Sequence, residues 1–502
     1  MRVLLPLLML CLGCAPGAEP RPNVILITMD TVRADYVSCY GQPGGTAGNL
    51  PGGTTPFLDR LAEGGVQFRD AHSASAVTPV SHATILSGRF PPAHGLRVLS
   101  GEGGARLDES IPTLATRFRE AGYSTMAVHS AFPVSSVFGF SEGFDVFESL
   151  EGELAMNSER GKTTWDTQQF QRRSDATTDR VLALLEDQAE PWFLWVHYWD
   201  PHDPILKPPI EALEGMPSTE GVVGPISRGY ADFYAREIAF QDGQIGKLLE
   251  AAGAFSGSDR PLVAVTADHG EGLADGQARH GWSKHRMTYR EQLWVPFLLS
   301  GPGVPAGRVV DAQVRTADLA PTLLDFAGLA PSADVDGISL RPWIGGQRSD
   351  PLMVYADQVN YYDFNAGMVA QRPDSAFLFT ASDGRWKLIY RPHMVGQSEL
   401  FDLASDPHEE RNVASEHPAE FRRLLQELGS LRPWITRPFE PPGDRGSALA
   451  LTALGYAAGG SDRELEWTWY CPAHPGSDAD RPGRCDSADC DQQRVPRTNW
   501  SD

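Results

Sequence analysis

The chain has 502 residues, of which 41% are hydrophobic and 22% are charged, an ordinary composition for a globular protein. This length favours one large domain with appendages over three equal domains. The formal net charge of −22, from 43 Lys and Arg against 65 Asp and Glu, excludes a general nucleic-acid or anionic-membrane surface, which would need a basic stripe. Any anionic ligand must therefore be held by local positive charge, from a metal, Arg, Lys or His.

The first 20 residues have the layout of a secretory signal. Arg2 precedes an apolar run that reaches Leu10 and is too short to span a bilayer as a stable helix. Gly13 directly before Cys14 is similar to the end of a bacterial lipobox, although Cys11 stands where leucine is usual. The segment is either a lipoprotein signal, with Cys14 as the lipid attachment site, or a plain cleaved signal. We expect an exported protein of the periplasm or cell envelope that meets the membrane only through this lipid anchor.

Residues 22–345 alternate between apolar runs and amphipathic stretches, which predicts strands alternating with helices. The expected strands are 24–27, 192–196 and 261–266, and the expected helices are 179–186, 240–252 and 318–328. This alternation is typical of an α/β domain, with a large mixed sheet between helices and functional side chains at the carboxyl ends of strands.

Three further regions follow the large domain. Residues 346–437 predict a small α+β domain, because two strand-like runs precede an amphipathic helix. Residues 438–466 are rich in Pro, Gly, Ala and Ser and predict a linker. Residues 467–502 contain a cluster of Cys and His. The runs in the small domain are 376–380, 386–390 and the helical 418–428.

Polar residues directly follow two of the predicted strands. Asp30 comes after the first strand, and Asp268 and His269 come after the strand at 261–266. An aspartate at a strand end is common and usually has no function of its own. Two carboxylates and an imidazole, however, offer oxygen and nitrogen ligands suited to a divalent cation. Such a cation would lower the pKa of a coordinated hydroxyl and screen the charge of an anionic ester.

A third segment, residues 78–89 with the sequence TPVSHATILSGR, joins these two motifs. Their order and spacing resemble the sulfatase family, within the alkaline phosphatase superfamily, over about residues 22–435. Further stretches share the resemblance, at 193–204, 289–303, 317–328 and 399–403. The resemblance implies a sulfatase-like α/β fold and an enzyme that hydrolyses sulfate or phosphate esters. We expect Thr78, like the two aspartates, at a strand end.

The resemblance also implies roles for individual residues. The implied metal ligands are Asp30, Thr31, Thr78, Asp268, His269 and His280. Thr78 is the metal-bound nucleophile among them. Thr31 stands where many sulfatases have a second Asp, which weakens the expectation of calcium and admits magnesium, manganese or zinc.

The nucleophile segment departs from the sulfatase pattern. Sulfatases have a Cys or Ser there, followed by Pro and Arg, and oxidise it to formylglycine. Here Thr78 takes that position, the proline moves to Pro79, and His82 replaces the Arg. A threonine nucleophile is similar to that of nucleotide pyrophosphatase/phosphodiesterases and lipoteichoic-acid synthase-like enzymes, so phosphate mono- or diesters, or headgroup transfer, are favoured over sulfates. Alternatively, Thr78 has no catalytic role, either because another residue acts or because the protein is a degenerate ester- or metal-binding lipoprotein.

Basic residues near these motifs are candidates for contacts with the substrate. In sulfatases a His and a Lys from matching segments touch the transferred group, which implies His202 and either Lys284 or His285 as acids and anion contacts. His82 is a further catalytic candidate. Arg33 either binds the substrate anion or caps a helix locally. The expected substrate is a small-molecule, glycan-linked or lipid-linked anionic ester.

The C-terminal cluster consists of Cys471, His474, Cys485 and Cys490. Three thiolates and an imidazole can close a tetrahedral zinc site. The segment resembles a heavy-metal-binding module, although its last two cysteines are spaced Cys-x4-Cys rather than Cys-x2-Cys. The alternative is a disulfide plus one free thiol after export.

Overall fold

The computed structural model describes most of the chain between residues 21 and 431 and two short strands beyond it. The described residues are 21–41, 55–99, 106–150, 170–186, 188–202, 228–257, 259–273, 285–330, 334–360, 369, 372–392, 394–431, 467–470 and 495–498. Among the helices in these ranges, none is both long enough and apolar enough to cross a bilayer.

A nine-stranded sheet forms the centre of the large domain, in the spatial order β4-β3-β5-β1-β6-β8-β2-β7, with β9 beside β2. Its strands are β1 (Val24–Met29), β2 (Val66–His72), β3 (Ser124–His129), β4 (Val146–Glu148), β5 (Trp192–Tyr198), β6 (Leu262–Ala267), β7 (Trp294–Val295), β8 (Phe297–Ser300) and β9 (Arg308–Arg315). The run from β4 to β6 is parallel, whereas β8 is antiparallel to both β6 and β2. This mixed sheet confirms the predicted fold class.

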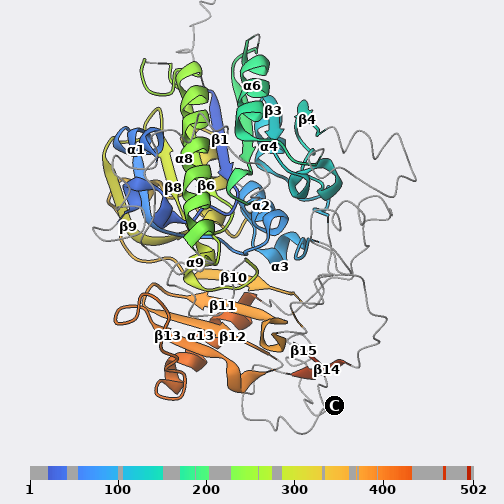
Figure 1. Cartoon of the computed structure of the whole chain (residues 1–502), viewed down its shortest axis with the longest axis vertical. Coiled ribbons are helices and arrows are strands. Elements are labelled where there is room, and N and C mark those ends of the chain that lie inside the picture. Colours follow the sequence, from blue (N-terminus) through green and yellow to red (C-terminus); the bar gives the residue numbers. More distant parts are fainter. Residues whose placement is uncertain are drawn as a thin grey trace, which may run out of the picture.

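Helices cover the sheet in two groups. The long α8 (Arg228–Ala251) packs against α6 (Ser174–Leu185) and α1 (Pro56–Glu63), and it crosses in front of the sheet in Figure 1. A second group joins α2 (Thr78–Ser87) to α4 (Leu114–Glu120) and α10 (Leu319–Phe326). Every residue of β1, β5 and β6 is buried, as expected of parallel strands covered on both faces.

Four of the predicted elements begin or end at other residues in the structure. The helices expected at 179–186 and 240–252 begin earlier, at Ser174 and Arg228. The strand expected to end at residue 196 continues to Tyr198, because its last residues still pair with β1 and β3. The third helix opens with a 3-10 turn (Thr316–Asp318) before α10.

A four-stranded antiparallel sheet lies below the large domain in Figure 1. It consists of β10 (Val354–Gln358), β11 (Leu378–Ser382), β12 (Trp386–Tyr390) and β13 (Glu399–Asp402), and α13 (Pro418–Leu431) packs on β11 and β12. Of two short helices, α9 (Arg290–Leu293) directly precedes β7, and α11 (Arg341–Ile344) lies between α10 and β10 in the chain. Farther along, β14 (Trp467–Tyr470) pairs antiparallel with β15 (Val495–Thr498).

Candidate active site

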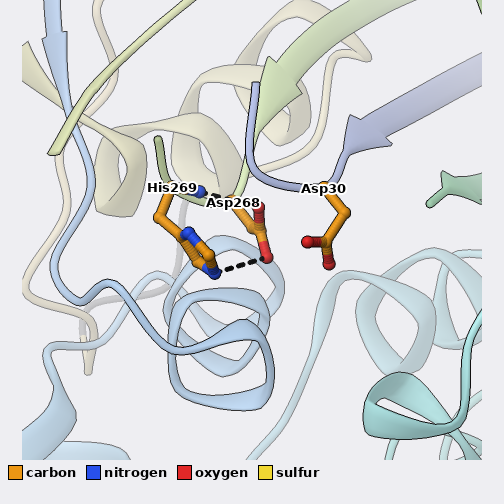
Figure 2. A group of neighbouring side chains, drawn as sticks. All are labelled: Asp30, Asp268 and His269. Carbon is orange, nitrogen blue, oxygen red and sulfur yellow. Dashed lines mark hydrogen bonds and ion pairs between the residues drawn. The ribbon is translucent and has the colours of Figure 1, made fainter. Parts of the chain in front are cut away.

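The two aspartates lie at the ends of neighbouring strands. Because β1 and β6 pair in parallel with Met29 beside Ala267, Asp30 and Asp268 leave the sheet side by side. The Asp268 amide donates to the Met29 carbonyl at 3.2 Å, and the Thr31 amide donates to Asp268 Oδ1 at 3.0 Å. Both carboxylates are fully buried. Figure 2 shows them facing one another, with His269 on the far side of Asp268.

His269 presents a lone pair to these carboxylates. Its Nδ1 lies 2.8 Å from the Gly270 carbonyl, which can only accept, so Nδ1 carries the proton and Nε2 does not. His269 Nε2 and Asp268 Oδ2 are 3.5 Å apart. Two electron-rich atoms at this distance repel one another unless a cation lies between them.

The cluster therefore fits a divalent metal ion. Ligand atoms of Asp30, Asp268 and His269 all lie within 4.8 Å of one another. Asp30 Oδ1 and Asp268 Oδ2 are buried and accept no hydrogen bond from the described residues. Burial and the charge of Asp268 raise the pKa of Asp30 well above its usual range, and burial also raises the pKa of Asp268. Two ionised carboxylates at this depth require a compensating charge, which these ligands suit.

Gly270 is held closely between two segments. Its amide donates to the Gln292 carbonyl at 2.8 Å. A Cβ atom at this position would lie 2.2 Å from the Glu291 carbonyl oxygen and 2.9 Å from Arg33 Cγ. Only glycine fits there, which explains why it directly follows the metal-site histidine.

Thr78 is the first residue of α2 and not a strand-end residue as the sequence predicted. Pro79 occupies the first turn of the helix, where its fixed φ and missing N–H favour helix initiation. Thr78 is 3% exposed, and its Oγ1 lies 3.5 Å from His269 Nε2. The hydroxyl thus stands beside the carboxylate and imidazole cluster, at the positive end of the helix dipole.

His82 lies one turn after Thr78 and points into the protein. Its Nδ1 donates to the Thr78 carbonyl at 2.8 Å, and its Nε2 accepts from the Thr28 hydroxyl at 3.0 Å. The Trp195 indole donates in turn to Thr28 Oγ1 at 3.0 Å. Burial lowers the pKa of His82 to about 4, so the ring is neutral at pH 7. With both ring nitrogens engaged in this way, His82 holds the start of α2, and its part in catalysis stays a prediction.

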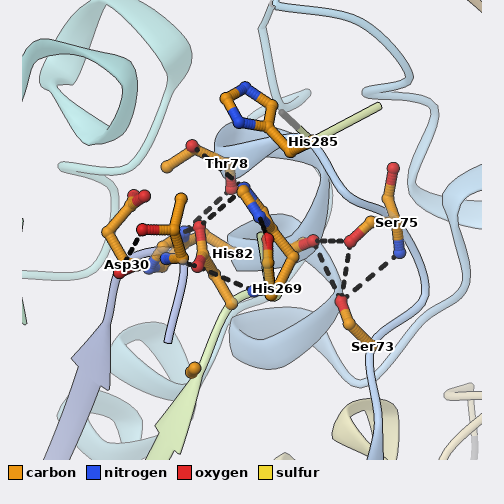
Figure 3. Close-up of polar contacts among 12 residues, drawn as sticks. Asp30, Ser73, Ser75, Thr78, His82, His269 and His285 are labelled. Carbon is orange, nitrogen blue, oxygen red and sulfur yellow. Dashed lines mark hydrogen bonds and ion pairs between the residues drawn. The ribbon is translucent and has the colours of Figure 1, made fainter. Parts of the chain in front are cut away.

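Two further histidines lie around Thr78 and His269. The ring of His285 is 5.0 Å from that of His269 and 5.3 Å from that of His202. His202 ends a 3-10 turn (Asp200–His202) and stacks on Trp199 with ring centroids 3.8 Å apart. Figure 3 shows His285 above Thr78 and His269. The structure therefore places His285 beside His269, with His202 next to His285.

Two other candidates, Arg33 and Thr31, form hydrogen bonds with residues close to them in the sequence. The Arg33 guanidinium is buried and donates to Asp35 at 2.9 and 2.5 Å. Arg33 directly precedes the short 3-10 turn Ala34–Tyr36, but its side chain makes no cap hydrogen bond to that turn. The Thr31 hydroxyl donates to the Asp30 carbonyl at 2.8 Å. Thr31 has φ 56°, so the chain turns sharply directly after Asp30.

The small sheet reaches into the site through β10. The Asp357 amide donates to the Ala74 carbonyl at 3.0 Å, just ahead of the Thr78 helix. The Ser75 hydroxyl donates to the Asp357 carbonyl at 3.0 Å and accepts from the Gln358 amide at 2.9 Å. Figure 3 shows Ser75 and its neighbour Ser73 on the side of His269. The segment that delivers Thr78 is thus fixed from both domains.

The same sheet also holds the segment that carries His285. The Asn360 side-chain amide donates to the carbonyls of Arg286 at 2.9 Å and Ser375 at 2.8 Å. Arg286 has φ 84°, so the chain bends sharply there and depends on such contacts.

Some predicted site residues lie outside the described part of the chain. These are Cys14, His280, Lys284, Cys471, His474, Cys485 and Cys490.

Sequence reasoning missed two buried residues at the site. His197 Nε2 lies 3.3 Å from Asp30 Oδ2, and Glu271 Oε2 lies 3.6 Å from His285 Nδ1. A signal for both was present: a histidine within an apolar strand, and a carboxylate three residues after Asp268.

The mixed sheet and this buried cluster at the ends of its parallel strands define an α/β metallohydrolase. A model described as Sulfatase matches residues 22–329, and one described as N-sulphoglucosamine sulphohydrolase, C-terminal, matches residues 278–432. The chain belongs to the sulfatase family of ester hydrolases, which confirms the predicted family and enzyme class. Members of this family use a divalent metal in the active site.

Two curated relatives illustrate the similarity. The Delta 4,5-hexuronate-2-O-sulfatase of Bacteroides thetaiotaomicron is 26% identical, over 86% of this chain and 92% of that protein. The choline-sulfatase of Rhizobium meliloti is 26% identical, over 78% of this chain and 82% of that protein.

A solved structure shares the fold at lower identity. The phosphonate monoester hydrolase of Silicibacter pomeroyi superposes with a TM-score of 0.63 at 21% identity, covering 82% of this chain and 95% of that one.

Proposed function

We propose that this protein is a metal-dependent ester hydrolase with Thr78 as its nucleophile. It acts on phosphate mono- or diesters, or transfers a phospho-linked headgroup, in preference to sulfate esters. The observation that carries the proposal is the position of the Thr78 hydroxyl, at the start of α2 and 3.5 Å from His269 Nε2, beside the buried Asp30 and Asp268.

The metal site would be formed by Asp30, Asp268 and His269. A divalent cation there, whether Ca²⁺, Mg²⁺, Mn²⁺ or Zn²⁺, would lower the pKa of the threonine hydroxyl and neutralise charge on the transferred group. Thr31 and His280 remain further ligand candidates, and Arg33 and Lys284 remain candidates for the substrate anion.

The described residues supply the remaining steps. Thr78 loses its proton to solvent and attacks phosphorus through Oγ1, forming a phosphothreonine ester as the bond to the leaving oxygen breaks. His202 or His285, in its protonated form, gives that oxygen a proton. The same imidazole, now neutral, then takes a proton from the water that attacks the phosphothreonine ester. Cleavage of the Oγ1–P bond releases phosphate from a monoester substrate, or a phosphate monoester from a diester, and Thr78 Oγ1 takes back a proton from solvent.

Sulfate and phosphate are distinguished by how this covalent ester is broken. A formylglycine hydrate has a second hydroxyl that expels sulfate, whereas threonine has one oxygen and cannot follow that route. Its ester must be opened by water at the transferred group. Phosphoryl transfer proceeds mainly by positioning and charge neutralisation, which this site offers. The relatives named above include two sulfatases, so the preference for phosphate needs its own test.

The test is a panel of p-nitrophenyl phosphate, bis-p-nitrophenyl phosphate and p-nitrophenyl sulfate, assayed after metal removal and after return of each cation. We expect cleavage of at least one phosphate ester to exceed that of the sulfate and to require the added metal. Sulfate cleavage far faster than every phosphate would overturn the preference. Metal content lost on dialysis with no activity on any ester would favour the degenerate binding protein.

The location and the C-terminal module are parts of the same proposal. Export and lipid attachment at Cys14 would place the enzyme in the periplasm or cell envelope, facing small-molecule, glycan-linked or lipid-linked anionic esters. The cluster of Cys471, His474, Cys485 and Cys490 would bind zinc apart from the catalytic site. Cobalt added to the whole protein should give thiolate absorption bands that a Cys485→Ser variant lacks. A chelator-resistant disulfide in this segment would overturn the zinc site.

A further inference from the structure

His197 approaches the metal cluster from behind Asp30. It lies on β5, in register with Thr28 of β1, two residues before Asp30. The Asp30 amide donates to the Tyr198 carbonyl at 2.8 Å, so strand pairing fixes the two residues relative to one another. His197 Nε2 lies 3.3 Å from Asp30 Oδ2, and both side chains are fully buried.

The proton on His197 can be placed from its contacts. An aspartate that binds a cation is ionised and only accepts, so Nε2 must carry the proton that faces it. His197 Nδ1 has no hydrogen-bond partner among the described residues. A proton on Nδ1 would leave a buried N–H without an acceptor and turn a lone pair toward the carboxylate, a doubly costly arrangement. Nε2–H is therefore the favoured tautomer.

The ring has little freedom to move away from this contact. The ring of His82 meets it edge-on at 4.9 Å, and Trp199 lies at 6.1 Å on the chain that continues from β5. Among the described side chains, the group whose ligand atoms lie within 4.8 Å of one another is Asp30, Asp268 and His269. His197 is not part of that group, so the geometry favours a role behind the ligand and not as a ligand.

We propose that His197 is a positioning residue for the metal site. It donates from Nε2 to Asp30 Oδ2 and thereby orients the carboxylate so that Oδ1, which accepts no hydrogen bond from the described part of the chain, is the oxygen available to the cation. Hydrogen bonds to ligating carboxylates commonly set metal affinity in this way. The inference rests on the proposed metal site at Asp30, Asp268 and His269.

The test compares two replacements of similar length. His197→Gln keeps an N–H donor that can reach Asp30, whereas His197→Met has none. His129→Met is the matched control, because His129 lies beside His197 in register on β3, is equally buried, and hydrogen-bonds the Ala131 carbonyl at 3.0 Å. Mn²⁺ binding to each metal-free protein is measured from the free-ion electron paramagnetic resonance signal, and the metal-free melting temperature checks folding.

We expect His197→Met to weaken Mn²⁺ binding roughly 10-fold to 100-fold. His197→Gln and His129→Met should stay within about 3-fold of the unchanged protein, which is below that range. Saturating Mn²⁺ should then restore most of the turnover of His197→Met. His197→Leu provides the donor-free comparison if the methionine variant does not fold.

Other outcomes separate the inference from the function on which it rests. Equal Mn²⁺ affinity in the Gln and Met variants, whether high or low, overturns the donor role of His197. If the unchanged protein does not bind Mn²⁺, the proposed metal site fails and His197 loses its role with it.

Discussion

Replacing Thr78 by alanine tests the nucleophile while leaving the fold in place. The substitution removes one buried methyl group, worth about 0.8 kcal/mol. It also removes the contact from Oγ1 to His269 Nε2, which at 3.5 Å lies at the limit of a hydrogen bond and is worth about 0.5 kcal/mol. Alanine is the better helix former by up to about 0.7 kcal/mol. The net loss of stability is therefore about 1 kcal/mol or less.

Catalysis should suffer far more. Without the Thr78 hydroxyl no covalent ester can form, so kcat on the best phosphate substrate should fall by at least about 1,000-fold, or about 4 kcal/mol in activation free energy. Thr78→Ser, which keeps the hydroxyl, should retain measurable activity. In the unchanged protein, acid quenching during turnover followed by peptide mass spectrometry should find a phosphoryl group on Thr78.

Thr84→Ala is the matched control for this experiment. Thr84 is a buried threonine of the same helix, and its Oγ1 contacts the Val80 carbonyl at 3.3 Å and His94 Nε2 at 3.1 Å, away from the metal cluster. It should lose stability of the same order but keep its turnover. Full activity of Thr78→Ala, or an equal loss in Thr84→Ala, would refute the nucleophile assignment.

Three further predictions concern the metal, the domain contact and the His285 segment. Burial and the charge of Asp268 raise the pKa of Asp30, so the metal-free fold holds a proton at this site that a bound cation must displace. Because cation binding then releases protons, added Mn²⁺ should raise the melting temperature more at pH 8.5 than at pH 6.5. A Mn²⁺ effect that shrinks with pH would contradict this. Arg97→Ala should cost about 3–5 kcal/mol in chemical denaturation, because it leaves the fully buried Asp357 carboxylate without its ion-pair partner. Removing the exposed Arg411 from its pair with Glu416 should change little, and similar effects of both would show that burial does not decide the cost. Asn360→Ala removes the donor to the Arg286 carbonyl and should lower kcat more than it changes KM for p-nitrophenyl phosphate; an unchanged kcat would show that His285 needs no support from the small domain.

The sequence alone was sufficient to locate the metal cluster. Asp30 and Asp268 each end a continuous apolar run, and strands of that kind lie buried in a parallel sheet whose carboxyl ends meet at one edge. The fold class follows from the same local pattern. Thr78 was found by its place in a family motif, but its position at the start of α2 was not, because Val77 and Thr78 suit a strand end as well as a helix start.

Only the tertiary structure decided which residues support this cluster. His197 and Asp30 are 167 residues apart in the chain and meet because β5 pairs with β1. Ser75 and Asp357 meet across the two domains, and Asn360 reaches the Arg286 carbonyl by the same route. Such contacts leave no periodic pattern in the sequence, since each depends on strand order and domain packing. The buried partners of His82 are known for the same reason only from the structure: Thr78 and Thr28 engage its two ring nitrogens from α2 and β1.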